Sequence, residues 1–155
     1  IKGAGIFAGG PYICSLGNAE AAVTTCMTTP ALINVALLEE TVVGLEVASQ
    51  IDSTSNLAGS KVFIYSGKSD SVVHTGVVTA NARMYAGYKA DVQTEYDINS
   101  WHCIPTLSSG IACASTGTPY LNKCEWYGVE NMLNWIVGPL NPPTDAIPDN
   151  IHEFD

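Results

Sequence analysis

Basic residues are scarce in this 155-residue chain, which has 6 Lys and Arg against 15 Asp and Glu and a formal net charge of −9 at pH 7. Affinity for nucleic acid depends largely on Lys and Arg side chains that displace counterions from phosphates, so we do not expect a nucleic-acid partner. Only 14% of the residues are charged, whereas 46% are hydrophobic. We therefore expect part of the molecular surface to be covered by something else.

Long hydrophobic runs and metal-binding motifs are also missing. The apolar run at residues 32–38 is followed by Glu39 and Glu40, well short of the ~18 residues that span a bilayer, which excludes a membrane span. No C-x-x-C motif occurs, so the usual signature of a zinc or thioredoxin-like site is absent, and we expect no metal or other cofactor. The length allows one domain. The chain opens on Ile1 without a basic and then apolar leader, so we expect any signal peptide to have been removed.

Five cysteines are present, and four of them form two pairs that are close in sequence. Cys14 with Cys26 and Cys113 with Cys124 bracket loop-like stretches, as disulfides do in an oxidising compartment. We therefore expect a secreted or luminal protein, although buried thiols in a cytosolic protein would give the same spacing. Cys103 is left over, either as a buried thiol or as half of a bridge to a partner.

The order of hydrophobic patterns predicts an α/β fold with a parallel sheet and flanking helices. We expect residues 2–10 to form a short buried strand that runs into a Gly-Gly-Pro turn, with no element before it to pair with. Residues 61–65 (KVFIY) are typical of a core strand, and residues 91–98 alternate as a second one. We expect helices at 19–26 (weak), 31–51 (one or two, buried or half-buried), 75–88 and 129–137, and loops at 52–59, 99–106 and 110–124.

Two residues lie where the reactive groups of open α/β sheets are found, beyond the carboxyl ends of the strands. Asp70 follows the strand 61–65 through a short turn, and His102 follows the strand 91–98 by four residues. Neighbouring parallel strands would bring the two loops to one edge. A carboxylate there could hold the imidazole while its second nitrogen takes a proton from a nucleophile. The simpler interpretation is an Asp that caps a turn and a His that is solvated.

Other candidates for chemistry are weaker. His74 begins the helix 75–88 and is expected to cap it or face solvent, and His152 lies in an acidic tail. No G-x-S-x-G motif is present: the nearest stretch contains Ser115, which follows the His and lies in a loop, so we reject it as a nucleophile elbow. Cys103, next to His102, has no other group that would lower its pKa. Trp101 could line an apolar cleft or pack in the core.

Five segments together resemble a known family, the extracellular polyhydroxybutyrate depolymerases. They are residues 3–14 (GAGIFAGGPYIC), 63–73 (FIYSGKSDSVV), 102–106 (HCIPT), 115–124 (STGTPYLNKC) and 140–143 (LNPP). They occur in the family's order over nearly the whole chain, while residues 28–60 resemble nothing specific. The resemblance implies an esterase of the α/β-hydrolase superfamily in which Asp70 and His102 are triad members. It also implies disulfide-bearing loops around the two cysteine pairs.

The resemblance covers only the C-terminal portion of such a catalytic domain, at residues 1–143, followed by an acidic tail at 144–155. The family's serine and its elbow lie upstream of the segment that aligns with residues 1–10. We therefore expect a fragment that supplies Asp70 and His102. A companion N-terminal chain, separated from the same precursor by proteolysis, would carry the serine. Together the two chains would hydrolyse an ester or polyester substrate. By itself the chain should hydrolyse little. The alternative is a non-catalytic binding or structural protein built on a truncated hydrolase scaffold.

Overall fold

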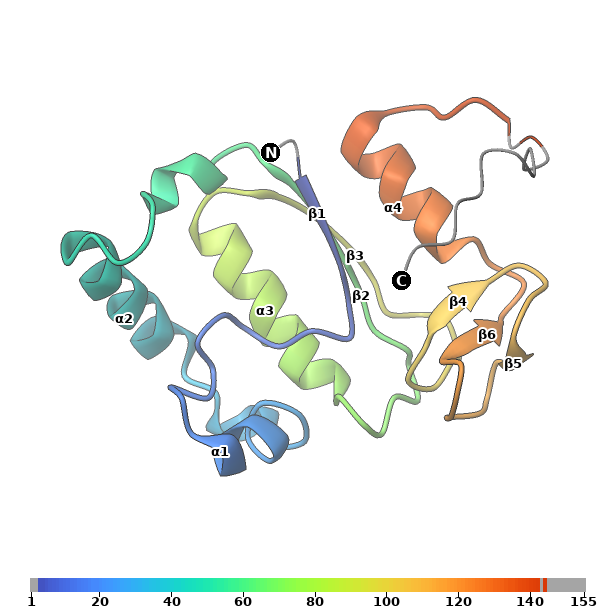
Figure 1. The fold of residues 1–155 in the computed structure, drawn as a ribbon, viewed down its shortest axis with the longest axis horizontal. Coiled ribbons are helices and arrows are strands. Elements are labelled where there is room, and N and C mark those ends of the chain that lie inside the picture. The colour runs from blue at the N-terminus through green and yellow to red at the C-terminus, as the bar shows by residue number, and fades with distance from the viewer. Residues whose placement is uncertain (1–2, 143, 145–155) are drawn as a thin grey trace, which may run out of the picture.

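The computed structural model describes residues 3–142 and 144, which form two small parallel sheets and the helices around them (Figure 1). In chain order the elements are β1 (Gly3–Phe7), α1 (Ala19–Val23), η1 (Pro30–Leu32), α2 (Val35–Val47), η2 (Thr54–Leu57), β2 (Lys61–Tyr65), α3 (Thr75–Gly87), β3 (Asp91–Glu95), β4 (Ile104–Thr106), β5 (Ile111–Ala112), β6 (Leu121–Lys123) and α4 (Gly128–Val137). The α/β arrangement with a parallel sheet and flanking helices is confirmed.

Strand β2 is the centre of the main sheet, which has the order β1-β2-β3 and is parallel throughout. Four of its five residues are buried because helices cover both faces. Alternate side chains of a strand point to opposite faces: Val62 and Ile64 pack against Val77 and Val78 of α3. The aromatic ring of Tyr65 stacks on Trp126 at 5.6 Å, on the face that α4 covers. Figure 1 shows α3 and α4 on opposite sides of this sheet.

The flanking strands are more exposed than the sequence predicts. β1 forms as predicted, but Ala4 and Gly5 are exposed, because β1 pairs with β2 along one edge only and the described residues place no strand along its other edge. β3 ends at Glu95 and not at residue 98. The expectation of a buried β1 is therefore wrong, and the reason is its position at the edge of the sheet.

Helix α2 occupies only part of the predicted helical stretch at residues 31–51. It buries Leu38 and Val42, which pack against Met84 of α3. Leu37, Val43 and Val47 of the same helix are exposed, so the dense hydrophobic pattern is only partly matched by burial. The apolar residues of α2 surround the helix, and only one side of it meets α3.

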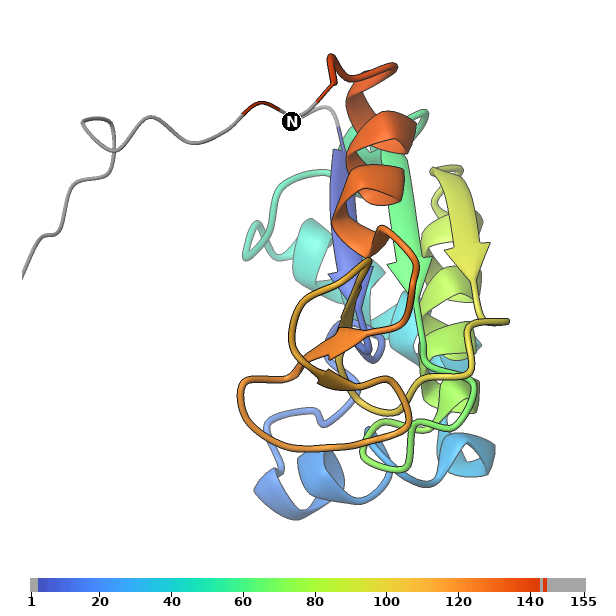
Figure 2. The same cartoon turned by 90° about the vertical axis from the view of Figure 1, so that its right-hand side faces the viewer.

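A second sheet, which the sequence analysis missed, lies beside the carboxyl end of the main sheet (Figure 2). Its strands β4, β6 and β5 are parallel and only two or three residues long. Residues 104–106 and 110–124 were expected to be loops because they are rich in Gly, Ser, Thr and Pro. Strands this short lack the alternating pattern that identifies longer ones.

The buried centre of β2 should dominate the stability of the fold. Ile64 is 0% exposed, so Ile64→Ala leaves a cavity and should lower the free energy of unfolding by about 2–5 kcal/mol. The measurement is denaturant-induced unfolding. Val47→Ala is the matched control, because Val47 is 81% exposed and its truncation should change stability by less than about 0.5 kcal/mol. Equal effects of the two changes would contradict this account of the core.

Candidate active site

Asp70 and His102 meet at the carboxyl end of the main sheet, as the sequence predicts. The Nδ1 atom of His102 lies 2.9 Å from the Oδ2 atom of Asp70. Asp70 comes at the end of the turn after β2, and His102 lies in the loop between β3 and β4. Parallel neighbours end at the same edge, so the pairing of β2 with β3 brings residues 32 positions apart into contact.

The Asp70 carboxylate is fully buried and has hydrogen bonds on both oxygens. Oδ1 accepts hydrogen bonds from the backbone amides of Val72 and Val73, each at 2.9 Å, and Oδ2 faces His102. The Asp70 side chain is 0% exposed, whereas the His102 side chain is 26% exposed. The turn-capping interpretation of Asp70 and the pairing interpretation are therefore both correct, one for each oxygen. Fixed in this way, the carboxylate can orient the imidazole, whose outer part is accessible.

The loops that carry the pair are joined by backbone hydrogen bonds. The amide of Lys68 donates to the carbonyl of Ile98 at 2.9 Å, and the amide of Ser69 donates to the carbonyl of Ser100 at 3.0 Å. Gly67 makes this approach possible, because a Cβ atom there would lie 2.5 Å from the carbonyl oxygen of Ser100. A residue without a side chain is therefore needed where the loops touch.

A buried hydroxyl pair lies beneath this junction. The side-chain oxygens of Tyr65 and Ser100 are within hydrogen-bond distance of each other, and Ser100 Oγ also donates to the carbonyl of Trp101. Burial raises the pKa of the Tyr65 phenol, although its hydrogen bond with Ser100 acts in the opposite direction. The phenol therefore stays neutral and ties the end of β2 to the loop that holds His102.

The second sheet holds the His102 loop from the other side. The amide of Trp101 donates to the carbonyl of Cys113 at 3.2 Å, and the amide of Cys124 donates to the carbonyl of Thr106 at 2.9 Å. Cys113 and Cys124 are joined by a disulfide. The buried Asn122 side chain also donates to the Cys113 carbonyl at 3.1 Å. A covalent bridge thus links the two points that anchor the loop on either side of His102.

Tyr120 is a residue of this site that the sequence analysis did not single out as functional. Its ring meets the His102 ring edge to face, with centroids 6.0 Å apart and an interplanar angle of 81°. Trp101, adjacent to His102 in sequence, is 39% exposed, so it lies at the surface and not in the core. The position of Tyr120 within the family-like segment 115–124 was the one available signal.

The weaker candidates have structural roles or lie away from the pair. His74 is the N-cap of α3, where its Nδ1 accepts a hydrogen bond from the amide of Gly76 at 3.2 Å, as expected of a capping histidine. The backbone carbonyl of Ser115 accepts a hydrogen bond from the Asn122 side chain at 2.6 Å, so Ser115 lies in a loop that Asn122 stabilises. His152 lies outside the described residues.

The cysteines pair as their spacing suggested. Cys14–Cys26 and Cys113–Cys124 are disulfides, and Cys103 is a buried free thiol. Burial raises the pKa of the Cys103 thiol, the charge of Asp70 raises it further, and a hydrogen bond with Ser100 opposes them. A thiol with a raised pKa is a poor nucleophile near neutral pH, which agrees with the rejection of a Cys–His dyad.

Residues 3–142 and 144 hold no group of three His, Cys, Asp or Glu side chains placed to bind a metal ion. No helix within the same residues is long and apolar enough to cross a bilayer.

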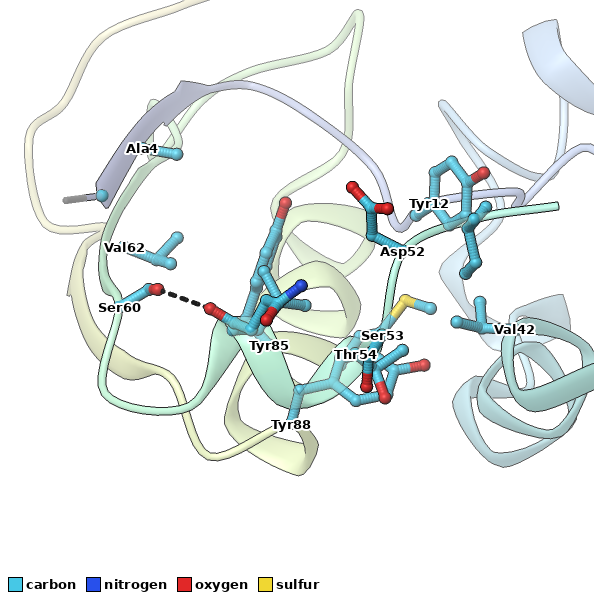
Figure 3. Close-up of a pocket in the computed structure, with 15 residues that line it drawn as sticks. Ala4, Tyr12, Val42, Asp52, Ser53, Thr54, Ser60, Val62, Tyr85 and Tyr88 are labelled. Atoms are coloured by element: carbon cyan, nitrogen blue, oxygen red, sulfur yellow. Dashed lines mark hydrogen bonds between the residues drawn. The ribbon is translucent and has the colours of Figure 1, made fainter. Parts of the chain in front are cut away.

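A cavity of about 700 Å³ lies at the opposite end of the sheet from Asp70 and His102 (Figure 3). Its walls include Ala4 and Val62 near the starts of β1 and β2, Val42 of α2, and Tyr85 and Tyr88 of the region around α3. Neither Asp70 nor His102 lines it. The cavity therefore lies between the starts of β1 and β2 and the helices α2 and α3, and it is not part of the Asp–His site.

Two curated proteins are similar to this chain over nearly its whole length. A poly(3-hydroxybutyrate) depolymerase from Delftia acidovorans is 37% identical over 147 residues, which is 94% of this chain and 30% of that protein. A polyhydroxybutyrate depolymerase from Talaromyces funiculosus is 28% identical over 146 residues, or 90% of this chain and 41% of that protein. No family model matches the chain.

Solved structures give the same picture of the fold. A PHB depolymerase from Penicillium funiculosum superposes with a TM-score of 0.79 at 24% identity, and a PHB depolymerase variant in complex with an R3HB trimer superposes with a TM-score of 0.80 at 25% identity. Each match covers 94% of this chain and 46% of the other. The chain thus spans less than half the length of each of these four proteins.

Gly67 should be required for the junction of the two loops. Gly67→Ala places a methyl group against the backbone of Ser100, so the loops must separate, at a cost of about 1–3 kcal/mol in unfolding free energy. Denaturant unfolding measures this loss. Gly44→Ala is the control: nothing lies within 4 Å of its Cβ position in α2, and it should stabilise the protein by about 0.5–1 kcal/mol. A Gly67→Ala protein as stable as the parent would contradict the close approach.

Thiol counting should distinguish Cys103 from the disulfides. In the native protein a thiol reagent should react slowly, because Cys103 is buried with a raised pKa. In denaturant without reductant one thiol per chain should react, and after reduction all five cysteines. The measurement is the absorbance of a disulfide-exchange reagent. Three or more reactive thiols in the unreduced, denatured protein would contradict the pairing.

Proposed function

Because this chain is polyhydroxybutyrate-depolymerase-like over nearly its whole length, we propose that it supplies the Asp and His of a Ser-His-Asp triad in a polyester-hydrolysing serine esterase. The observation that carries the proposal is the contact of 2.9 Å between His102 Nδ1 and the buried Asp70 carboxylate. This contact lies at the carboxyl ends of parallel strands, where α/β enzymes hold their reactive groups. The nucleophilic serine comes from outside the 155 residues.

The contact between the two side chains supports a distinct role for each residue in this reaction. Asp70 accepts a hydrogen bond from Nδ1–H of His102, which selects the tautomer with a free lone pair on Nε2 and stabilises the imidazolium that forms later. Nε2 takes the proton of the serine hydroxyl as that oxygen attacks the ester carbonyl. His102 then returns the proton to the departing alcohol, and water hydrolyses the acyl-enzyme by the same steps. The amides of Val72 and Val73 keep the carboxylate in place during these transfers.

The open edge of β1 supports a companion segment that carries the serine. Both connections, β1 to β2 and β2 to β3, place their helices on the α3 side of the sheet, as right-handed crossovers require. A further parallel strand beside β1 would be followed by a helix on that same side. The cavity of about 700 Å³ next to Ala4, Val62 and Tyr85 lies there (Figure 3).

This placement also puts the nucleophile at the correct edge. In α/β hydrolases the serine lies on the sharp turn between a strand and the helix that follows it. The carboxyl end of a parallel strand beside β1 would lie at the sheet edge where Asp70 and His102 meet. We propose that the segment is a companion N-terminal chain of the same precursor, and that residues 1–143 form the C-terminal portion of one catalytic domain, followed by the tail 144–155.

The substrate class and the compartment follow from the relatives and the disulfides. Each relative bears the name of a polyhydroxybutyrate depolymerase, and one similar structure holds an R3HB trimer, so we propose a polyester of hydroxy acids as the substrate. Two disulfides form readily in oxidising compartments. We therefore propose secretion or residence in a lumen.

The composition of the native material tests the companion chain. Intact mass spectrometry, without and with reductant, should find a second chain with the 16.4 kDa one, and a fluorophosphonate probe should label a serine on that second chain. A labelled serine on one continuous polypeptide would overturn the companion chain but keep the triad. Unlabelled material that contains this chain alone would favour the non-catalytic alternative, in which the exposed apolar residues serve binding or assembly.

Removal of the imidazole tests the triad itself. In the complete enzyme, His102→Ala should lower kcat for ester hydrolysis by at least about 10³-fold, because the proton acceptor of the serine is lost. Stability should change little, since the side chain is partly exposed. His74→Asn is the matched control, because Asn also caps helices well and kcat should stay unchanged. Near-normal turnover of His102→Ala would refute the assignment.

A further inference from the structure

We propose that Tyr120 is a positioning residue for His102: its ring, which lies just before β6 of the second sheet, keeps the imidazole in the orientation in which Nδ1 meets Asp70. This inference rests on the proposed catalytic role of the Asp70–His102 pair. It concerns a side chain that lies 18 positions further along the sequence than His102, immediately before β6 of the second sheet.

A second contact is needed because the hydrogen bond to Asp70 fixes the imidazole at one point only. Within residues 3–142 and 144, Nδ1 has its partner in Asp70 and no protein group is hydrogen bonded to Nε2. The ring could therefore tilt about the Nδ1–Oδ2 direction. The Tyr120 ring, at a centroid distance of 6.0 Å and an angle of 81°, has the edge-to-face geometry that aromatic pairs favour. This contact limits the tilt of the imidazole.

The backbone, and not burial, holds Tyr120 in place. Its amide donates to the carbonyl of Gly117 at 2.7 Å, and its carbonyl accepts from the amide of Ile104 at 2.9 Å. The residue has φ +60°, a conformation that costs free energy for a non-glycine residue. Its side chain is 47% exposed. Packing alone poorly explains a tyrosine whose backbone conformation is unfavourable and whose side chain is nearly half exposed.

The Ile104 hydrogen bond ties Tyr120 to the loop that it supports. Ile104 begins β4, two residues after His102, and β4 pairs with β6, which begins one residue after Tyr120. Movement of the second sheet would therefore carry Tyr120 and the end of the His102 loop together. The Cys113–Cys124 disulfide joins the two ends of the segment that contains Tyr120. It thereby limits movement of the Tyr120 ring relative to the imidazole.

The test compares Tyr120→Asn with Tyr120→Phe in the complete enzyme. Asn tolerates positive φ better than other non-glycine residues, so the first variant removes the ring without adding backbone strain, and the second removes only the hydroxyl. We expect Tyr120→Asn to lower kcat about 10- to 100-fold, the scale of a small misplacement of a reacting group, with KM nearly unchanged. Tyr120→Phe should keep kcat within about 2-fold, since the ring makes the contact.

Nuclear magnetic resonance of the imidazole gives a readout that does not depend on turnover. With labelled histidine, the Hε1 signal of His102 should shift in Tyr120→Asn, where the ring current is lost, and stay near its parent position in Tyr120→Phe. Tyr127→Asn is the control, because Tyr127 is 46% exposed at the start of α4, and both kcat and the His102 signal should be unchanged.

The outcomes separate this proposal from the proposed function. If His102→Ala abolishes turnover but Tyr120→Asn leaves kcat within about 3-fold, the triad stands and the role of Tyr120 is refuted. A rise in KM alone would also refute it, because Tyr120 would then contact the substrate and not position the histidine. If Tyr120→Phe is as slow as Tyr120→Asn, the hydroxyl and not the ring acts. An unchanged Hε1 signal in Tyr120→Asn would exclude the contact itself, whatever the activity.

Discussion

The close approach of two loops at Gly67 is the constraint on which the candidate site depends. Strand β2 is buried on both faces and leaves its carboxyl end in a turn that meets the loop after β3. With no side chain on Gly67, the backbone of Ser100 can come near enough for the amide of Ser69 to bond its carbonyl. Asp70 and His102 extend from these two loops, and their contact of 2.9 Å follows from that junction.

Most of the machinery around the pair holds groups in place. The Asp70 carboxylate is held by hydrogen bonds with two backbone amides and one imidazole nitrogen. The His102 loop is anchored at both ends to the disulfide-bridged second sheet. Orientation of this kind lets an imidazole accept a proton without a search for the right geometry. The open edge of β1 and the cavity near its start leave room for the companion segment that we propose.

Much of the fold could be predicted from particular residues. The β-branched and aromatic run 61–65 identified β2 with its observed ends, and the positions of Asp70 and His102 after successive strands predicted their meeting. The short strands β4, β5 and β6 were missed, because two or three residues carry no periodicity and their composition is that of loops. The apolar residues of 31–51 predicted more burial than α2 has, since hydrophobicity alone does not say what covers a helix.

The sequence by itself determined the α/β class, the core strand β2, and the places of Asp70 and His102 after the carboxyl ends of two neighbouring strands. It did so because these depend on local composition and on the rule that parallel strands share one edge. Only the tertiary structure decided that one oxygen of Asp70 caps a turn while the other faces His102, and that Tyr120 lies against the imidazole. The contacts of Asp70 and Tyr120 with His102 join residues that are 32 and 18 positions apart. Local sequence patterns can suggest that such residues share one edge of a sheet, but they do not fix which side-chain atoms meet.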